Sequence, residues 1–140
     1  MFQAVRWASR RGLREEGDIS RETKGETYAY WYLRRNGYVF VARNCTPRGI
    51  KGELDLVGYD GKTLAFVEVR TRTVRDDMSA LPELSVTREK QHVVVRTAQR
   101  FLAECRMGEC PCRFDVVAID NRPGLAPVVR LRKDAFSPQM

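Results

Sequence analysis

Three acidic residues on two neighbouring β-rich runs are the feature of the sequence best suited to chemistry. Glu53 and Asp55 lie two positions apart in the first run, and Glu68 lies in the second. Side chains alternate across a strand, so Glu53 and Asp55 share one face. Carboxylates gathered on one face of a sheet repel one another unless a cation lies among them. Oxygen ligands of this kind suit Mg²⁺ or Mn²⁺, so the pattern favours a divalent metal site.

The dipeptide Asp60-Gly61 predicts a tight hairpin turn between the two runs, because glycine accepts a positive φ. With these two residues in the turn, Asp55 pairs with Phe66 on the opposite strand. Asp55 and Glu68 are then diagonal neighbours on the same face, about 7–8 Å apart at Cα. Carboxylates at that spacing can share one ion.

A salt-bridge cluster centred on Arg70 is the alternative to a metal. Arg70 is expected on the same face as Asp55 and Glu68, and Lys51 lies nearby in the sequence. This alternative holds if the hairpin lies at a sheet edge or is half solvated. The continuous apolar run over residues 64–67 favours a strand that is buried on both faces, and therefore the metal.

The elements that must position the hairpin alternate between helical and strand-like patterns. Gly37 closes a predicted helix that begins at Glu22, and Thr87 can cap a second helix that runs to about Cys105. Strands are predicted over residues 38–43, 53–59, 63–71, 113–119 and 128–131. This order predicts an α/β protein with a mixed sheet covered by helices.

The charge balance favours a polyanionic partner. The chain has 140 residues, 25 of them Lys or Arg, and a net charge of +7. Phosphates attract such a protein at long range, although an arginine-rich coding bias would give the same count. No apolar run has membrane-spanning length and residues 1–6 do not resemble a signal peptide, so we expect a cytoplasmic protein without a membrane contact.

Two further features leave alternatives open. Residues 1–21 form a basic segment ahead of a single predicted domain over residues 22–140. This segment is either a short helix with a basic face or a frayed terminus.

The four cysteines have no standard zinc spacing, and we expect free thiols at Cys45, Cys105, Cys110 and Cys112.

An ordered set of short motifs resembles the YraN family of bacterial proteins over about residues 22–120. That family is similar to the archaeal Holliday-junction resolvases and, with them, to the PD-(D/E)XK nucleases. The resemblance implies a restriction-endonuclease-like fold, a three-layer α/β/α arrangement with a central mixed sheet. The motifs are Gly25-Glu26, Gly37-Tyr38, Arg43-Asn44, Gly52-Glu53-Leu54-Asp55-Leu56-Val57, Phe66-Val67-Glu68-Val69-Arg70, Lys90 with Ala98, and Arg113-Phe114-Asp115-Val116-Val117.

The resemblance also implies roles for individual residues. Asp55 and Glu68 match the catalytic acids that bind the metal in the nuclease motif. Glu26 matches the acid of the first helix that completes the site, and the backbone carbonyl of Val69 would be a further ligand. The metal, Mg²⁺ or Mn²⁺, would activate a water molecule for attack on a phosphodiester.

Arg70 departs from the family motif, which normally ends in lysine. Lysine is a compact point charge whose pKa can fall, whereas an arginine side chain keeps its proton. An arginine can still hold a phosphate oxygen through two N–H groups, so Arg70 is counted with the catalytic residues. The departure predicts slow cleavage that Arg70→Lys would accelerate. Lys51 and Lys90 are the candidates to supply the lysine from another element.

Three functions remain open at this point. The first is a metal-dependent endonuclease that acts on nucleic acid, in particular structured or branched DNA. The second is a catalytically inactive nucleic-acid-binding module of the same fold, and the third is an assembly protein with an acidic partner. A two-fold symmetric junction would suit a homodimer, although no interface stands out in the sequence. The residues expected to contact nucleic acid, DNA more readily than RNA, are Arg43, Arg48, Lys51 and Lys90.

Overall fold

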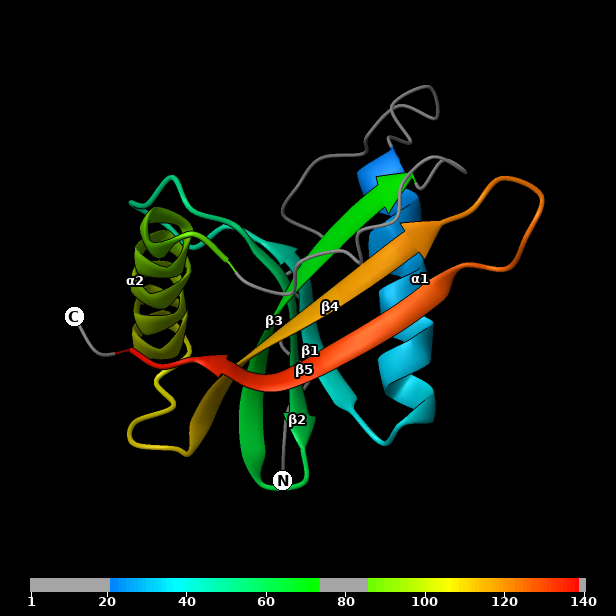
Figure 1. The fold of residues 1–140 in the computed structure, drawn as a ribbon. Helices are drawn as coiled ribbons and strands as arrows, with labels where there is room; N and C mark the ends of the chain where they lie inside the picture. The colour runs from blue at the N-terminus through cyan, green and yellow to red at the C-terminus, as the bar shows by residue number, and fades with distance from the viewer. Residues whose placement is uncertain (1–20, 74–85, 139–140) are drawn as a thin grey trace.

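The computed structural model describes residues 21–73 and 86–138, which form two helices and five strands (Figure 1). The basic segment predicted over residues 1–21 lies outside this range except for Arg21, the first residue of a helix. The elements in chain order are α1 (Arg21–Arg35), β1 (Val39–Cys45), β2 (Leu54–Asp60), β3 (Thr63–Thr73), α2 (Arg88–Glu104), β4 (Cys112–Asn121) and β5 (Val128–Phe136). The predicted order of helices and strands is therefore confirmed, with the last strand extending to Phe136.

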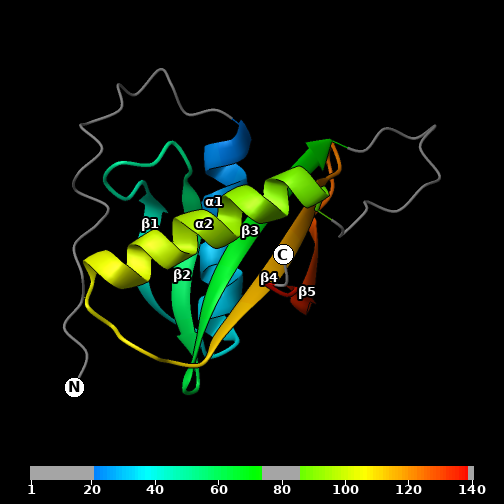
Figure 2. The ribbon, with the colours of Figure 1, turned by 90° about the vertical axis from the view of Figure 1, so that its left-hand side faces the viewer.

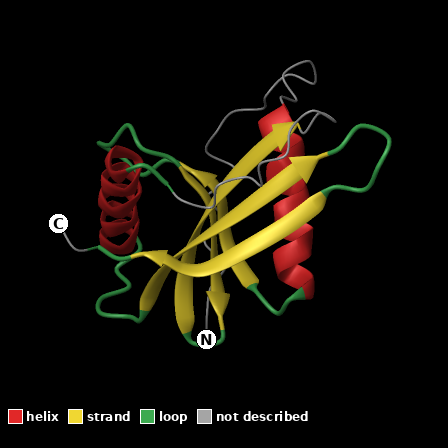
Figure 3. Cartoon of the chain, in the orientation of Figure 1, coloured by secondary structure: helices red, strands yellow, loops and turns green. Residues whose placement is uncertain are grey.

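The five strands form one mixed sheet in the order β1-β2-β3-β4-β5 (Figure 3). Strands β1, β2 and β3 pair antiparallel, β3 and β4 pair parallel, and β4 and β5 pair antiparallel. A parallel pair needs a crossover connection, and α2 lies in the one between β3 and β4. The α/β fold class with a mixed sheet is thus confirmed.

The two helices pack against opposite faces of the sheet. Figure 2 shows α2 in front of the strands and α1 behind them. Ala29 and Leu33 of α1 share one buried cluster with Leu56, whereas Phe101 of α2 shares another with Val57. Because neighbouring residues of a strand point to opposite faces, Leu56 and Val57 divide these two cores. Each large side chain buried in them stabilises the fold by about 1.5–3 kcal/mol.

Both helix boundaries follow the predicted signals. Gly37 has φ +92° after the last turn of α1, and the N–H of Tyr38 donates to the carbonyl of Leu33 over 3.1 Å. Such a bond supplies an N–H donor to a carbonyl in the last turn, which has no donor within the helix. The side chain of Thr87 caps α2, where it accepts a hydrogen bond from the backbone N–H of Lys90 over 3.2 Å. This cap fixes the first turn of α2, which carries Lys90.

The predicted hairpin forms, but its predicted register is wrong. Asp60 pairs with Thr63, so the turn consists of Gly61 and Lys62 rather than of Asp60 and Gly61. Gly61 has φ +63° at the first turn position, where a II′ turn takes its glycine. The same register pairs Leu56 with Val67. One step further along it, Asp55 lies directly opposite Glu68 rather than diagonal to it, which brings the two acids closer than predicted.

A buried acid on β4 is neutralised within the fold. Asp115 of β4 is fully buried and accepts hydrogen bonds from Arg113 Nε over 2.7 Å and from the hydroxyl of Tyr38 over 2.8 Å. Arg113 also binds Asp60, which Lys133 contacts as well. The Arg113-Phe114-Asp115 motif therefore has a structural role on the α1 side of the sheet.

Candidate metal site in an acidic pocket

A pocket of about 460 Å³ lies where β2 begins, between the first turns of the two helices. It gathers residues from α1, β2, β3 and α2 that are up to 64 positions apart in the sequence. All five residues predicted as catalytic or metal-binding are among those that line it. The lining residues are Glu26, Glu53, Asp55, Glu68, Val69, Arg70, Thr71, Val86, Thr87 and Lys90.

Glu26 reaches the pocket because α1 approaches β3 closely at Gly25. A methyl group at Gly25 would overlap the side-chain oxygen of Thr71 on β3. Glycine is the residue that permits this contact between a helix and a strand. The next residue, Glu26, is thereby placed over the start of β2, and its Oε2 atom is buried.

Glu53 is positioned by a second close contact of the same kind. A methyl group at Gly52 would overlap the side-chain oxygen of Thr97, which is fully buried in α2. The segment that leads into β2 therefore lies directly against α2. Each of two glycines that touch a threonine thus precedes an acid of the pocket.

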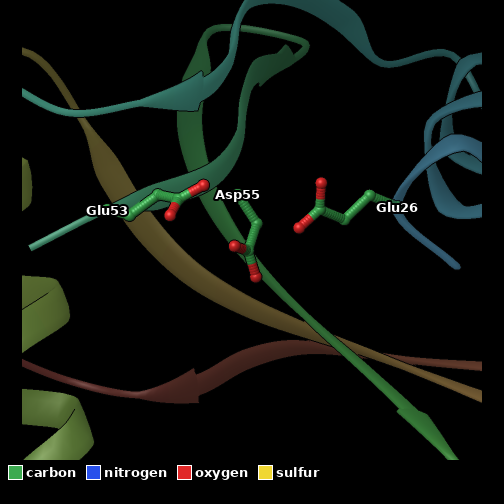
Figure 4. A group of neighbouring side chains, drawn as sticks. All are labelled: Glu26, Glu53 and Asp55. Carbon is green, nitrogen blue, oxygen red and sulfur yellow. The ribbon is translucent and has the colours of Figure 1, made fainter. Parts of the chain in front are cut away.

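Three carboxylates converge at the centre of the pocket (Figure 4). One oxygen from each of Glu26, Glu53 and Asp55 lies within 4.8 Å of the other two. Glu53 was expected on the same face as Asp55 but not as a ligand. Its position two residues before Asp55 was the signal for that role, since residues i and i+2 of a strand share a face.

Asp55 is held by the backbone of the neighbouring strand. The N–H of Val69 donates to Oδ2 of Asp55 over 2.9 Å. Burial, with a smaller contribution from the charge of Glu53, raises the pKa of Asp55 to about 6, although the Val69 hydrogen bond lowers it. Asp55 is therefore fixed in direction but costly to ionise without a nearby cation.

Glu68 is still more strongly affected by its surroundings. Its side chain is only 10% exposed, and burial followed by the charge of Asp55 raises its pKa to about 8. Lys90 opposes this shift, with its Nζ atom 3.3 Å from Oε1 of Glu68. A lysine from α2 thus lies beside the acid that corresponds to the E-x-K motif.

The predicted nucleic-acid contacts fall in different places. Lys90 lines the pocket, whereas Arg43 packs on α1, where it donates to Thr27 over 3.3 Å and lies 4.4 Å above the ring of Tyr30. Arg48 and Lys51 are exposed outside the pocket. The structure therefore brings one of the four predicted residues to the acids, and Arg70, which is exposed, lies at the same pocket.

The donor set fits a hard divalent cation. Mg²⁺ binds oxygen ligands at about 2.0–2.1 Å in an octahedron, so neighbouring ligand oxygens are about 3 Å apart and opposite ones about 4 Å. The three carboxylate oxygens lie within 4.8 Å of one another, so side-chain movements of about 1–2 Å would bring them to that spacing. A cation among them would also offset the repulsion and burial that raise the pKa values of Asp55 and Glu68.

The four cysteines are free thiols, as predicted. Two of them lie together, because the Sγ atoms of Cys110 and Cys112 are 3.6 Å apart. Burial, followed by the hydrogen bond to Cys110, raises the pKa of Cys112 to about 12. These thiols lie outside the acidic pocket. In the part of the chain that the structure describes, no helix is long and apolar enough to span a membrane.

Comparison with known proteins finds one family. A family model described as "Uncharacterised protein family UPF0102" matches residues 25–119, which include every residue that lines the pocket. The chain is 40% identical over 114 residues to a UPF0102 protein of Koribacter versatilis, covering 81% of this chain and 76% of that protein. It is 42% identical over 113 residues to one of Geotalea uraniireducens, covering 81% and 86%. For one of Pseudomonas aeruginosa the identity is 40% over 113 residues, covering 80% and 87%.

Proposed function

The chain belongs to the UPF0102 (YraN-like) family, and from that premise and the geometry of its pocket we propose that it is a metal-dependent endonuclease. The observation that carries the proposal is the convergence of Glu26, Glu53 and Asp55 within 4.8 Å. Like charges held close together in a half-buried pocket are costly, and such clusters gather at functional sites.

The proposed ligands of a single Mg²⁺ or Mn²⁺ ion are the three converging carboxylates. Glu68 and the carbonyl of Val69 stay further predicted ligands, since both residues line the same pocket. When bound, such an ion lowers the pKa of a coordinated water and neutralises charge on a phosphodiester. The Val69 N–H keeps Asp55 oriented, so that its other oxygen can face the ion.

Lys90 is the residue that we propose in place of the missing motif lysine. It contacts Glu68 at 3.3 Å from α2, whereas the motif would supply the lysine from position 70 on β3. A lysine there presents a positive charge to an anionic substrate and can hold or move a proton. Arg70, at the same pocket, can hold a phosphate oxygen through two N–H groups but cannot accept a proton.

The substrate that we propose is nucleic acid, with structured or branched DNA as the first form to test. The net charge of +7 favours a polyanion. Helices on both faces of a mixed sheet are the layers that a restriction-endonuclease-like α/β/α fold contains. The resemblance to junction resolvases supplies the preference for branched DNA.

Single-turnover cleavage of fluorescent linear, flapped and four-way DNA tests the proposal. We expect cleavage with Mg²⁺ or Mn²⁺ but none with EDTA. Asp55→Asn keeps an acceptor for the Val69 N–H and should lower the rate by roughly 100-fold or more, and Lys90→Ala by roughly 10- to 100-fold. Glu109→Gln and Lys62→Ala remove matched charges from exposed residues outside the pocket and should cleave as the wild type does. Equal cleavage by wild type and folded Asp55→Asn would contradict the proposal.

The second candidate function is an inactive nucleic-acid-binding module of the same fold. The observation in its favour is Arg70, which stands where the nuclease motif has lysine. Arg70→Lys restores that lysine and should raise the rate if the endonuclease is real but slow. If none of these proteins cleaves any substrate while all bind DNA in a salt-sensitive way, the binding module is the better account.

A further inference from the structure

The stretch of chain between the two outer acids of the pocket is entirely without acidic residues. From residue 27 to residue 52 there is no Asp or Glu, although Glu26 and Glu53 flank the stretch. Its five basic residues are Arg34, Arg35, Arg43, Arg48 and Lys51. The unit formed by α1 and β1 is therefore locally positive, and it begins at the pocket where Glu26 lies.

The same unit exposes aromatic side chains. Tyr28 is 42% and Trp31 50% exposed, although aromatic rings usually lie inside a fold. They are three positions apart on α1, and Arg35 follows four positions later, so the three share one side of the helix. Among the described residues, half of the large exposed apolar side chains belong to α1 and β1, namely Tyr28, Trp31 and Val39.

Trp31 is fixed in place by its neighbours rather than loosely exposed. The ring of Tyr30 meets it edge-on with the centroids 5.2 Å apart. The guanidinium of Arg34 lies 5.4 Å from the centroid of Trp31 and also donates to the hydroxyl of Tyr30 over 3.3 Å. A ring that is already held in place loses little conformational freedom when it binds a partner.

We propose that this aromatic stripe, defined as Tyr28, Trp31, Arg34 and Arg35, binds an unpaired nucleic-acid strand that extends from the acidic pocket. Exposed rings stack on unpaired bases, and neighbouring arginines bind the phosphates between them. Duplex DNA keeps its bases stacked on one another, so it cannot use the rings in this way. The inference rests on the proposed function, and it specifies a substrate with a single-stranded arm beside the cleaved bond.

The stripe lies farther along α1 than the pocket and on another side of the helix. Trp31 follows Glu26 by five residues, which is about 8 Å along the axis of α1 and about 140° around it, so a strand that reaches both must pass around the helix. Because α1 continues away from the pocket to Arg35, the stripe offers a track along the exposed side of one helix. An acidic protein could also bind the stripe, but exposed rings beside arginines favour stacking on unpaired bases.

Binding measured in EDTA tests the inference without any need for cleavage. Trp7→Phe removes the other of the two tryptophans, so that the remaining tryptophan fluorescence comes from Trp31. We expect single-stranded oligothymidine or oligouridine to quench this fluorescence more strongly than a duplex of equal length. In fluorescence anisotropy, Trp31→Ala should weaken single-strand binding by about 10-fold and duplex binding by less than about 2-fold. Trp31→Phe should keep most of the affinity.

Leu125→Ala is the matched control, because Leu125 is also an exposed apolar residue but lies between β4 and β5. Unchanged single-strand affinity of Trp31→Ala overturns the inference. So does a loss of dimers in sedimentation velocity that accompanies Trp31→Ala without a change in affinity, because the stripe would then bind a second copy. Loss of cleavage in every assay would overturn the endonuclease proposal alone, since the single-strand effect is measured without metal.

Discussion

The acids of the pocket are costly to the fold as single residues. Glu68 is buried beside Asp55, and burial holds the pKa of each carboxyl above its ordinary value, at about 8 and about 6 respectively. Lys90 offsets part of this cost for Glu68. If a cation offsets this cost, the protein without the cation should be less stable, and the difference in unfolding free energy can be measured.

The pH dependence of stability follows from these two shifts. A carboxyl with a raised pKa binds its proton more tightly in the folded protein, so its contribution to stability is present below about pH 4 and is lost as pH rises to about 8. Glu68→Gln removes the larger shift. In EDTA we expect the free energy of unfolding of Glu68→Gln to gain on that of the wild type by about 1–2 kcal/mol between pH 5 and pH 8.

Urea denaturation at pH 5, 6.5 and 8 measures this difference, and Glu109→Gln serves as the control because Glu109 is exposed and outside the pocket. Saturating Mn²⁺ should narrow the gap at pH 8, because the variant keeps the three converging carboxylates but lacks Glu68 as a further ligand and so gains less stability than the wild type. A difference between variant and wild type that stays constant with pH would refute the account of Glu68.

Residue types and spacing, with the family resemblance, were enough to predict most of the acids that line the pocket. Asp55 and Glu68 came from strand alternation, and Glu26 came from the family resemblance. Arg43 shows where this reasoning stops, because its place above Tyr30 depends on how α1 meets β1. The ion pair of Lys90 with Glu68 likewise depends on the packing of α2. The sequence could only offer Lys90 and Lys51 as two candidates for that lysine.

At the scale of elements, two contacts between glycine and threonine set the width of the pocket. Gly25 brings α1 against β3, and Gly52 brings the start of β2 against α2. The sequence showed both glycines beside their acids but not the threonines that they touch. Such close approaches are invisible in a sequence, since Thr97 lies 45 positions from Gly52.

Gly52→Ala should therefore disturb the pocket, because its methyl group would overlap Oγ1 of Thr97. We expect a loss of Mn²⁺ affinity of about 10-fold or more, together with about 1–3 kcal/mol of stability. Thr97→Ala removes the overlapping oxygen, so the double variant Gly52→Ala/Thr97→Ala should regain much of the affinity. Calorimetric titration with Mn²⁺ gives the comparison. A double variant no better than Gly52→Ala would show that this contact does not position Glu53.

The hairpin shows how a small error at the level of elements moves a site. The turn was expected one residue too early, and this shifted the pairing of every residue in β2. Side-chain faces were still assigned correctly, because the pairing slipped by an even number of residues. A slip of an odd number would have placed Asp55 and Glu68 on opposite faces.

At the scale of the whole molecule, the acidic groups divide between the two faces of the sheet. Asp55 and Glu68 point to the face that α2 covers, whereas Asp115 is in register with Val67 and points to the face that α1 covers. The network is closed internally, since Arg113 binds both Asp115 and Asp60. Hydrophobic pattern and topology predicted the sheet, but a fully buried aspartate inside an apolar strand was predictable only as part of a family motif.

Breaking the network should separate stability from function. Asp115→Ala leaves Arg113 and Tyr38 without their central acceptor, and we expect it to cost about 3–5 kcal/mol of unfolding free energy. Because Asp115 and Glu68 point to opposite faces of the sheet, the folded fraction of this variant should bind Mn²⁺ with the affinity of the wild type. Chemical denaturation and a metal titration at low temperature measure the two quantities. Loss of both Mn²⁺ affinity and stability would show that the Asp115 network and the pocket are coupled.

The central claim is that Glu26, Glu53 and Asp55 together hold one divalent cation. A Mn²⁺ titration monitored by electron paramagnetic resonance tests it most directly, because the signal of free Mn²⁺ decreases when the ion binds. We expect one ion per chain for the wild type and for Glu109→Gln, and a loss of affinity of about 10- to 100-fold for Asp55→Asn. Binding of Mn²⁺ with the same affinity and stoichiometry by wild type and folded Asp55→Asn would contradict the claim.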